Sequence, residues 1–308
     1  MSLQTIQSKF ESVFDLVSII PTKTYVDAAK SLNKGLPDLD YETLVVLAYA
    51  YPKRTIASSK THLVPSFYTF GEDYHRAMKK RIKAICDDLG YKTSYGVDNH
   101  PLDERLMASL SGIGFLGKNQ LIISQTYGSY IFLAYVLIDH PYEDLHQVTI
   151  DNHCGTCRQC IDACPTNALS ELGYDMEKCM SFYNQEKIPL STKQMKDNYA
   201  LFGCDICQLV CPKNLGKGKI VHQAFELNGN EKVAIEDIFN LTKKAFNQKY
   251  HYPAYMWKGK TLLMRNAAMM MYQQKNADYL DLLEASLEQF DMPWYQKTLN
   301  TVINALKK

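Results

Sequence analysis

Eight of the nine cysteines lie between residues 154 and 211 and can act together as metal ligands. The first run reads Cys154-x2-Cys157-x2-Cys160-x3-Cys164 and is followed by proline. In bacterial ferredoxins, a run with this spacing gives three thiolates to one 4Fe-4S cluster and the fourth to a second cluster. The sequence therefore predicts two clusters and the transfer of single electrons.

The second run, Cys204-x2-Cys207-x3-Cys211, also precedes proline but is one cysteine short. Two clusters need eight thiolates, and Cys179 between the runs can complete the set. We assign to cluster one Cys154, Cys157, Cys160 and Cys211. We assign to cluster two Cys164, Cys179, Cys204 and Cys207.

Zinc is the alternative for these thiolates, because paired Cys-x2-Cys runs also form tetrahedral zinc sites. Two interleaved runs that each end in Cys-Pro are typical of iron-sulfur proteins instead. The ninth cysteine, Cys86, lies within a helical pattern and is interpreted as a small buried apolar residue.

Length and composition favour an ordinary globular chain with two or three packed units. It has 308 residues, of which 46% are hydrophobic and 22% charged, with a formal net charge of +1. The longest apolar runs, 44–51 and 131–138, are too short to span a bilayer, and the N-terminus has no signal-peptide pattern. We expect a cytoplasmic protein without membrane segments, in which the cysteines stay reduced.

Strand and helix patterns alternate before the cysteines, which predicts a mixed α/β unit. The expected strands are 15–20, 43–50, 121–124 and 131–138, and the expected helices are 74–89 and 102–110. Three glycines between residues 112 and 117 indicate a tight turn or a close approach of the backbone to another group. After the cysteines, helical patterns occur at 257–272, at 277–290 and after Pro293.

Motifs along nearly the whole chain resemble those of the epoxyqueuosine reductase family. They are 71–75 (Gly-Glu-Asp-Tyr-His), 97–108, 112–119, 128–130, the cysteine segments around 179 and 203–208, 257–260 (Trp-Lys-Gly-Lys) and 265–267 (Arg-Asn-Ala). The resemblance implies a reductase that converts epoxyqueuosine to queuosine at the wobble position of tRNA. It also implies that electrons pass through two 4Fe-4S clusters to cobalamin.

The same resemblance implies an α+β multidomain fold with three contiguous segments. Residues 1–145 would form a nitroreductase-like α/β cobalamin-binding domain, 146–220 a ferredoxin-like two-cluster module, and 221–308 a helical HEAT-like region that binds tRNA. An external electron donor would supply the electrons, and a monomer would suffice.

Asp98 and Arg105 are the candidate catalytic and substrate-binding residues by this resemblance. Loss of an epoxide oxygen as water requires a proton source, and a carboxylic acid can be that source when burial raises its pKa. Asp98 follows a strand-like segment and matches the family's proton donor, while Arg105 matches a position that faces the substrate. From the sequence alone, Asp98 could equally cap a helix and Arg105 could lie on a solvated helix face.

The cobalamin contacts are likewise implied by the resemblance. Lys118 and Asn119 would bind the cofactor from the glycine-rich turn, although a plain turn before a strand is the simpler interpretation. Asp98 would also face the cofactor, and Ile122 and Leu133 would lie along the corrin ring. The Asp-x-His-x-x-Gly pattern that supplies a histidine to cobalt is absent, so we expect no histidine ligand to cobalt.

A basic stretch could bind the RNA. Residues 213 to 265 include ten Lys or Arg but only four acidic residues, and seven aromatic residues are interleaved with them. Such aromatics can stack on RNA bases, although most residues of this type pack in a core.

Two other functions remain compatible with the cysteines. A reductive dehalogenase of a small organohalide would share the clusters and the cobalt, and a ferredoxin-type electron carrier would bind no corrinoid. The first usually carries an export signal, and the second leaves Asp98 without a role.

Overall fold

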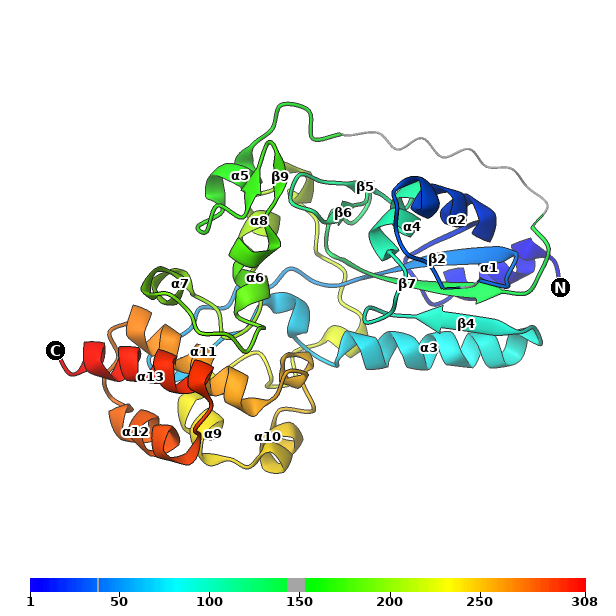
Figure 1. Ribbon diagram of the computed structural model, residues 1–308. Coiled ribbons are helices and arrows are strands. Elements are labelled where there is room, and N and C mark those ends of the chain that lie inside the picture. Colours follow the sequence, from blue (N-terminus) through cyan, green and yellow to red (C-terminus); the bar gives the residue numbers. More distant parts are fainter. Residues whose placement is uncertain (38, 143–152) are drawn as a thin grey trace. The chain divides into compact units, whose positions relative to one another are not determined.

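The computed structural model describes residues 1–37, 39–142 and 153–308, which form two compact units (Figure 1). Unit 1 comprises Met1–Lys53, Tyr74–Arg158 and Cys211–His222; unit 2 comprises Arg54–Asp73, Gln159–Val210 and Gln223–Lys308. The units are therefore interleaved in sequence. The predicted three-segment division stays a prediction, and its boundary at 145/146 lies outside the described residues.

Unit 1 is built on a four-stranded antiparallel sheet in the order β1-β2-β7-β4. Its strands are β1 (Leu16–Pro21), β2 (Thr43–Ala50), β4 (Thr93–Gly96) and β7 (Ile131–Ile138). β2 and β7 are the central strands and pair along their full length, with Thr43 opposite Ile138 and Ala50 opposite Ile131. Every residue of β2 is buried, because helices cover both faces of the sheet.

The helices of unit 1 are α1 (Leu3–Glu11), α2 (Thr22–Ser31), α3 (Tyr74–Leu89) and α4 (Glu104–Leu110). α2 and α4 pack on one face through Tyr25, Met107 and Ala108, against apolar side chains of β2 and β7. α1 and α3 lie together on the other face (Figure 1). A short hairpin of β5 (Phe115–Leu116) and β6 (Ile122–Ile123) follows α4.

Unit 2 combines short cysteine-bearing elements with a helical part. The cysteine-bearing part contains α5 (Gln159–Ala163), β8 (Leu169–Ser170), β9 (Gly173–Tyr174), α6 (Met180–Tyr183), α7 (Thr192–Asp197) and α8 (Ile206–Leu209). The helical part contains α9 (Ile235–Asn240), α10 (Lys243–Lys249), α11 (Lys260–Gln273), α12 (Leu280–Gln289) and α13 (Pro293–Leu306). β3 (His62–Leu63) pairs with β10 (Val233–Ala234), and one apolar core around α11 joins both parts.

The predicted elements agree closely with the structure where the apolar pattern is strong. The strand at 43–50 and the helix at 74–89 have the expected bounds, and Cys86 is buried in that helix as predicted. α1 and α2 were not predicted. Asp98 is not a helix cap, because Asp103 caps α4 by accepting a hydrogen bond from the Leu106 N–H.

Short 3-10 helices connect these elements: η1 (Phe67–Thr69), η2 (Met176–Lys178), η3 (Pro212–Asn214), η4 (Gln223–Phe225) and η5 (Ala254–Met256). Among the described residues, no helix has both the length and the apolar character needed to cross a membrane.

Candidate active site and iron-sulfur ligands

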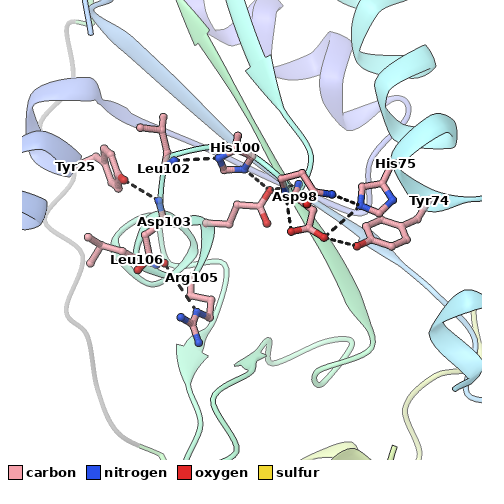
Figure 2. Close-up of polar contacts among 11 residues, drawn as sticks. Tyr25, Tyr74, His75, Asp98, His100, Leu102, Asp103, Arg105 and Leu106 are labelled. Atoms are coloured by element: carbon pink, nitrogen blue, oxygen red, sulfur yellow. Dashed lines mark hydrogen bonds and ion pairs between the residues drawn. The ribbon is translucent and has the colours of Figure 1, made fainter. Parts of the chain in front are cut away.

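Asp98 lies in unit 1, in the loop between β4 and α4, and its carboxylate is turned towards the start of α3 (Figure 2). Its Oδ2 accepts a hydrogen bond from the Tyr74 hydroxyl at 2.8 Å and lies 3.2 Å from His75 Nε2. Tyr74 is held by stacking on Phe132 of β7, with ring centroids 4.1 Å apart. The sheet and α3 thus fix the two groups that orient the carboxylate.

These contacts lower the pKa of Asp98 well below its usual range. The hydrogen bond with His75 is the largest cause, and the Asn99 N–H and the Tyr74 hydroxyl act in the same direction, while burial opposes them. The condition that burial raise the pKa of the proton donor is therefore not met in this arrangement. The side chain is 54% exposed, so desolvation is too weak to favour the neutral acid.

The Asp98 loop has an uncommon backbone. Asp98 and Asn99 both have positive φ, at 46° and 44°, a region that is uncommon for residues other than glycine, although Asn and Asp adopt it more often than most. Glu104 Oε1 stabilises this backbone by accepting hydrogen bonds from the Asp98 N–H at 2.9 Å and from the His100 ring, whose Nε2 is 2.7 Å away. Two consecutive left-handed residues cost on the order of 1–3 kcal/mol each, and such strain is typical of functional loops.

Asp98 and Arg105 line the same hollow, with a volume of about 570 Å³. Lys34, Asp103 and Glu104 also line it, so its wall is mainly polar and charged. Arg105 Nη1 reaches the Gln120 carbonyl oxygen at 3.4 Å, which ties α4 to the β5–β6 turn. The structure therefore brings the two predicted residues to one polar hollow.

The β5–β6 turn carries Lys118 and Asn119. Lys118 Nζ donates to the Cys157 carbonyl oxygen at 3.2 Å, which connects the turn to a predicted cluster ligand. The Nδ2 of Asn119 is buried and has no hydrogen-bond partner among the described residues. An orphaned buried amide is rare in folded proteins and is expected where a bound molecule completes its hydrogen bonds.

Ile122 and Leu133 differ in what they offer to a cofactor. Ile122 is buried in the apolar core of unit 1, whereas Leu133 of β7 is only partly buried at its edge. Leu133 is therefore the more accessible of the two predicted corrin contacts.

The predicted ligands of cluster two all lie in unit 2. Burial raises the pKa of the Cys207 thiol above its usual range, and the neighbouring thiolates of Cys204, Cys179, Cys160 and Cys164 raise it further. Burial likewise raises the pKa of Cys204 to about 11. A bound iron-sulfur cluster would relieve this mutual repulsion, because iron binds thiolates.

Three predicted ligands of cluster one, Cys154, Cys157 and Cys211, lie in unit 1. Burial raises the pKa of Cys211, and the nearby Cys154 and Cys157 add to this effect. The fourth, Cys160, belongs to unit 2 and lies two residues beyond Arg158, the last residue of that segment of unit 1. The assignment of these eight cysteines to two clusters therefore stays a prediction. Within the described ranges, no three His, Cys, Asp or Glu side chains are grouped as ligands of a single metal ion.

The predicted basic stretch needs one correction. Arg265 is 0% exposed, so it cannot belong to an RNA-binding surface. Most interleaved aromatics are core residues as expected, and only Tyr252 and Trp257 are well exposed. Lys213, Lys217 and Lys219 belong to unit 1 and the remaining lysines to unit 2, so the stretch is not one element of structure.

Tyr74 and His75 were not predicted as site residues, although they lie in a motif that the sequence resemblance includes. A signal was present, because aromatic and imidazole side chains at the start of a helix can reach a neighbouring strand end. Only the fold shows that this strand end carries Asp98.

Known proteins match the chain in sequence. A family model described as a 4Fe-4S double cluster binding domain matches residues 153–214. An epoxyqueuosine reductase of Bacillus subtilis is 33% identical over 252 residues, which cover 78% of this chain and 65% of that protein. The corresponding enzyme of Atelocyanobacterium thalassa is 31% identical over 245 residues, covering 74% of this chain and 77% of the relative. The chain belongs to the epoxyqueuosine reductase family.

Solved structures of epoxyqueuosine reductases agree with this family. A Bacillus subtilis structure, described as having an aspartate catalytic loop swung out of the active site, matches 99% of this chain and 90% of its own, with 26% identity and a TM-score of 0.85. Another, with an epoxyqueuosine-modified tRNA-Tyr stem loop, matches 99% and 98% with 26% identity and a TM-score of 0.80. The predictions of an oxidoreductase family and of iron-sulfur clusters are confirmed at this level.

Proposed function

We propose that this chain reduces epoxyqueuosine to queuosine at the wobble position of tRNA. The observation that carries the proposal is the family membership, together with a fold match over 99% of the chain to a reductase solved with epoxyqueuosine-modified tRNA. Removing the epoxide oxygen breaks two C–O bonds and leaves a C=C bond. The reaction consumes two electrons and two protons and releases one water.

Asp98 is proposed to give a proton to the departing oxygen. It is partly exposed at the polar hollow, and Arg105 on the same wall can bind polar groups of the substrate. Because the carboxylate is ionised in this arrangement, it must take up a proton before it can act as an acid. His75, whose Nε2 is 3.2 Å from Asp98, is the closest imidazole that can supply one.

Cobalamin is proposed to bind beside this hollow. The unpartnered amide of Asn119, the ammonium group of Lys118 and the accessible edge of Leu133 would hold polar and apolar parts of it, with Asp98 and the Ile122 side of the hairpin adjacent. When bound, the corrinoid would supply a low-potential cobalt centre and the clusters would relay electrons one at a time. No histidine of this chain is proposed as a cobalt ligand.

The remaining parts of the proposal concern the two cluster assignments and the setting. Cluster one would use Cys154, Cys157, Cys160 and Cys211, and cluster two Cys164, Cys179, Cys204 and Cys207. An external electron donor would supply electrons in the cytoplasm, where thiols stay reduced, and a monomer would suffice. The finer relationships, a nitroreductase-like fold for residues 1–145 and a HEAT-like fold for residues 221–308, belong to the same proposal.

The test is anaerobic reconstitution with iron, sulfide and cobalamin, followed by incubation with a reductant and tRNA that carries epoxyqueuosine. Nucleoside mass spectrometry should find a product lighter by one oxygen, and its formation should require cobalamin. No product from protein with verified clusters and corrinoid would favour a small-substrate reductase. Failure to bind any corrinoid would favour the electron carrier.

A further inference from the structure

Arg265 of α11 is fully buried, and among the described residues no carboxylate forms an ion pair with it, although Glu186 lies near enough to favour its charged form. Its guanidinium donates to backbone carbonyls at the end of the short helix α6 and just after it. Nη1 donates to Glu186 O at 2.7 Å and Ile188 O at 3.2 Å, and Nη2 donates to Tyr183 O at 3.3 Å and Asn184 O at 3.2 Å. Burial lowers its pKa to about 9. A buried cation is unfavourable unless its hydrogen bonds are satisfied, so this arrangement fixes the 183–188 backbone strongly.

Asn266, the next residue of α11, extends the same network to a second segment. Its Nδ2 donates to Asn184 O at 2.7 Å and to Leu201 O at 2.9 Å, while its Oδ1 accepts from Arg265. Asn266 is also 0% exposed. One amide group thus joins the chain after α6 to the chain at residue 201.

Asn184 completes the connection. Its Nδ2 donates to Gly203 O at 2.9 Å, and its Oδ1 accepts from the Gly203 N–H at 3.1 Å, so the side chain pairs with the backbone as a strand would. Gly203 has a φ of +76°, and a Cβ there would lie 2.6 Å from Ser66 Cβ. Both the conformation and the space require glycine at this position.

The two connected segments each carry a predicted ligand of cluster two. Cys179 precedes α6, and its carbonyl oxygen accepts from the Phe182 and Tyr183 N–H groups, while Cys204 directly follows Gly203. We propose that Arg265, Asn266 and Asn184 are positioning residues for cluster two, which hold the Cys179 and Cys204 segments at the separation that the cluster needs. This inference rests on the proposed ligand sets and assigns α11 a role beyond packing.

The network has no contact with the unit 1 segments that carry Cys154, Cys157 and Cys211 among the hydrogen bonds described above. Disturbing it should therefore release cluster two and spare cluster one. A merely structural role would instead lower overall stability and affect both clusters alike.

The test compares Asn266→Ala with Asn276→Ala in the full chain after anaerobic reconstitution. Asn276 is a matched control, because it is 1% exposed, follows the same helix and donates through Nδ2 to a backbone carbonyl, Lys60 O, at 2.7 Å. Wild type and Asn276→Ala should hold about eight irons per chain, the content of two 4Fe-4S clusters. Asn266→Ala should hold about four, and electron paramagnetic resonance should show one reduced cluster.

A background variant identifies which cluster is lost. Adding Asn266→Ala to the Cys154→Ala variant should remove nearly all of its iron, because both clusters are then lost. Adding Asn266→Ala to the Cys179→Ala variant should change its iron content little, because cluster two is already lost. If Asn266→Ala does not fold, the Arg265→Lys variant is tested in its place, because lysine keeps the charge but cannot bind four carbonyls. Chelator-induced iron release from Arg265→Lys should then be biphasic, with half of the iron released faster. Equal iron content and release in wild type, Asn266→Ala and Arg265→Lys would overturn the inference. A wild type with fewer than two clusters would instead contradict the proposed function.

Discussion

At the scale of single residues, the protonation of Asp98 is governed by two neighbours on α3. Tyr74 and His75 both point at the same carboxylate oxygen, and they favour its ionised form more than partial burial disfavours it. To act as the proposed proton donor, the ionised carboxylate of Asp98 must first either receive a proton from His75 or move away from His75. The two positive φ angles at Asp98 and Asn99 place backbone strain at this carboxylate, as is typical of functional sites.

Asp98→Asn should reduce turnover at least about 100-fold, because general acid catalysis typically contributes a factor of this size or more. Asparagine keeps the size of the side chain and can still accept from Tyr74. Cluster absorbance should be unchanged, and corrinoid should still bind through the other proposed contacts at Lys118, Asn119 and Leu133, as measured by visible spectroscopy. Asp87→Asn, an exposed position on α3, is the control. Normal turnover in Asp98→Asn would remove this residue from the mechanism.

His75→Gln should raise the pKa of Asp98 towards that of a free aspartate, since His75 is the largest cause of the lowering. A lowered pKa in the folded state stabilises the protein above about pH 4, and this contribution disappears as the pH falls through the folded-state value. The variant should therefore be less stable than wild type at neutral pH, with a smaller difference in acid. Carboxyl ¹³C NMR checks the pKa directly, with the exposed His251→Gln as control; an unchanged Asp98 titration would contradict the assignment.

At the scale of elements, continuous apolar runs were the most predictable features. The run at 43–50 is the fully buried strand β2, and the periodic pattern at 74–89 is α3. α2 was missed because only Thr22, Tyr25 and Ala29 are buried along it, which is a weak helical pattern. Cysteine spacing predicted the double-cluster domain, while the individual ligand assignments stay predictions. The contact between Asp98 and the start of α3 depends on sheet order, which the local pattern does not contain.

The turn before β7 should help to position a predicted ligand of cluster one, as α11 is proposed to position the ligand segments of cluster two. Gly128 has a φ of +62°, and an added Cβ would lie 2.2 Å from Asn214 Oδ1. Asn214 follows Cys211 in η3, and its Oδ1 accepts from the Ser129 N–H at 2.8 Å. Replacing Gly128 therefore displaces the chain that carries a predicted ligand.

Gly128→Ala should lower the free energy of unfolding by about 1–3 kcal/mol through backbone strain and the loss of a buried hydrogen bond. It should also speed chelator-induced release of about half of the iron. Gly35→Ala is the matched control, because a Cβ there meets no atom within 4 Å. If both alanine variants release iron at the wild-type rate, Asn214 does not position Cys211.

At the scale of the whole molecule, the chain is close to neutral, so the proposed binding of tRNA would have to rely on local clusters of positive charge. Unit 2 offers one such cluster on α10, where Lys243 and Lys244 are both exposed and have no acidic residue beside them in the sequence. Trp257 is exposed in the same unit and can stack on an unpaired base. Arg265, which was counted in the basic stretch from the sequence, instead donates hydrogen bonds to the backbone near α6.

Replacing Lys243 and Lys244 together with alanine should weaken tRNA binding and reduce its dependence on salt. Each lost phosphate contact lowers the slope of log K against log salt by about 0.7–0.9, so the double variant should lose roughly 1.5. The control replaces Lys79 and Lys80, two adjacent exposed lysines on α3 that change the net charge equally. Fluorescence anisotropy with an anticodon stem loop at several salt concentrations gives both slopes. Because both variants share the same net charge, a difference between them locates the RNA on α10, whereas equal slopes would show that only overall charge matters.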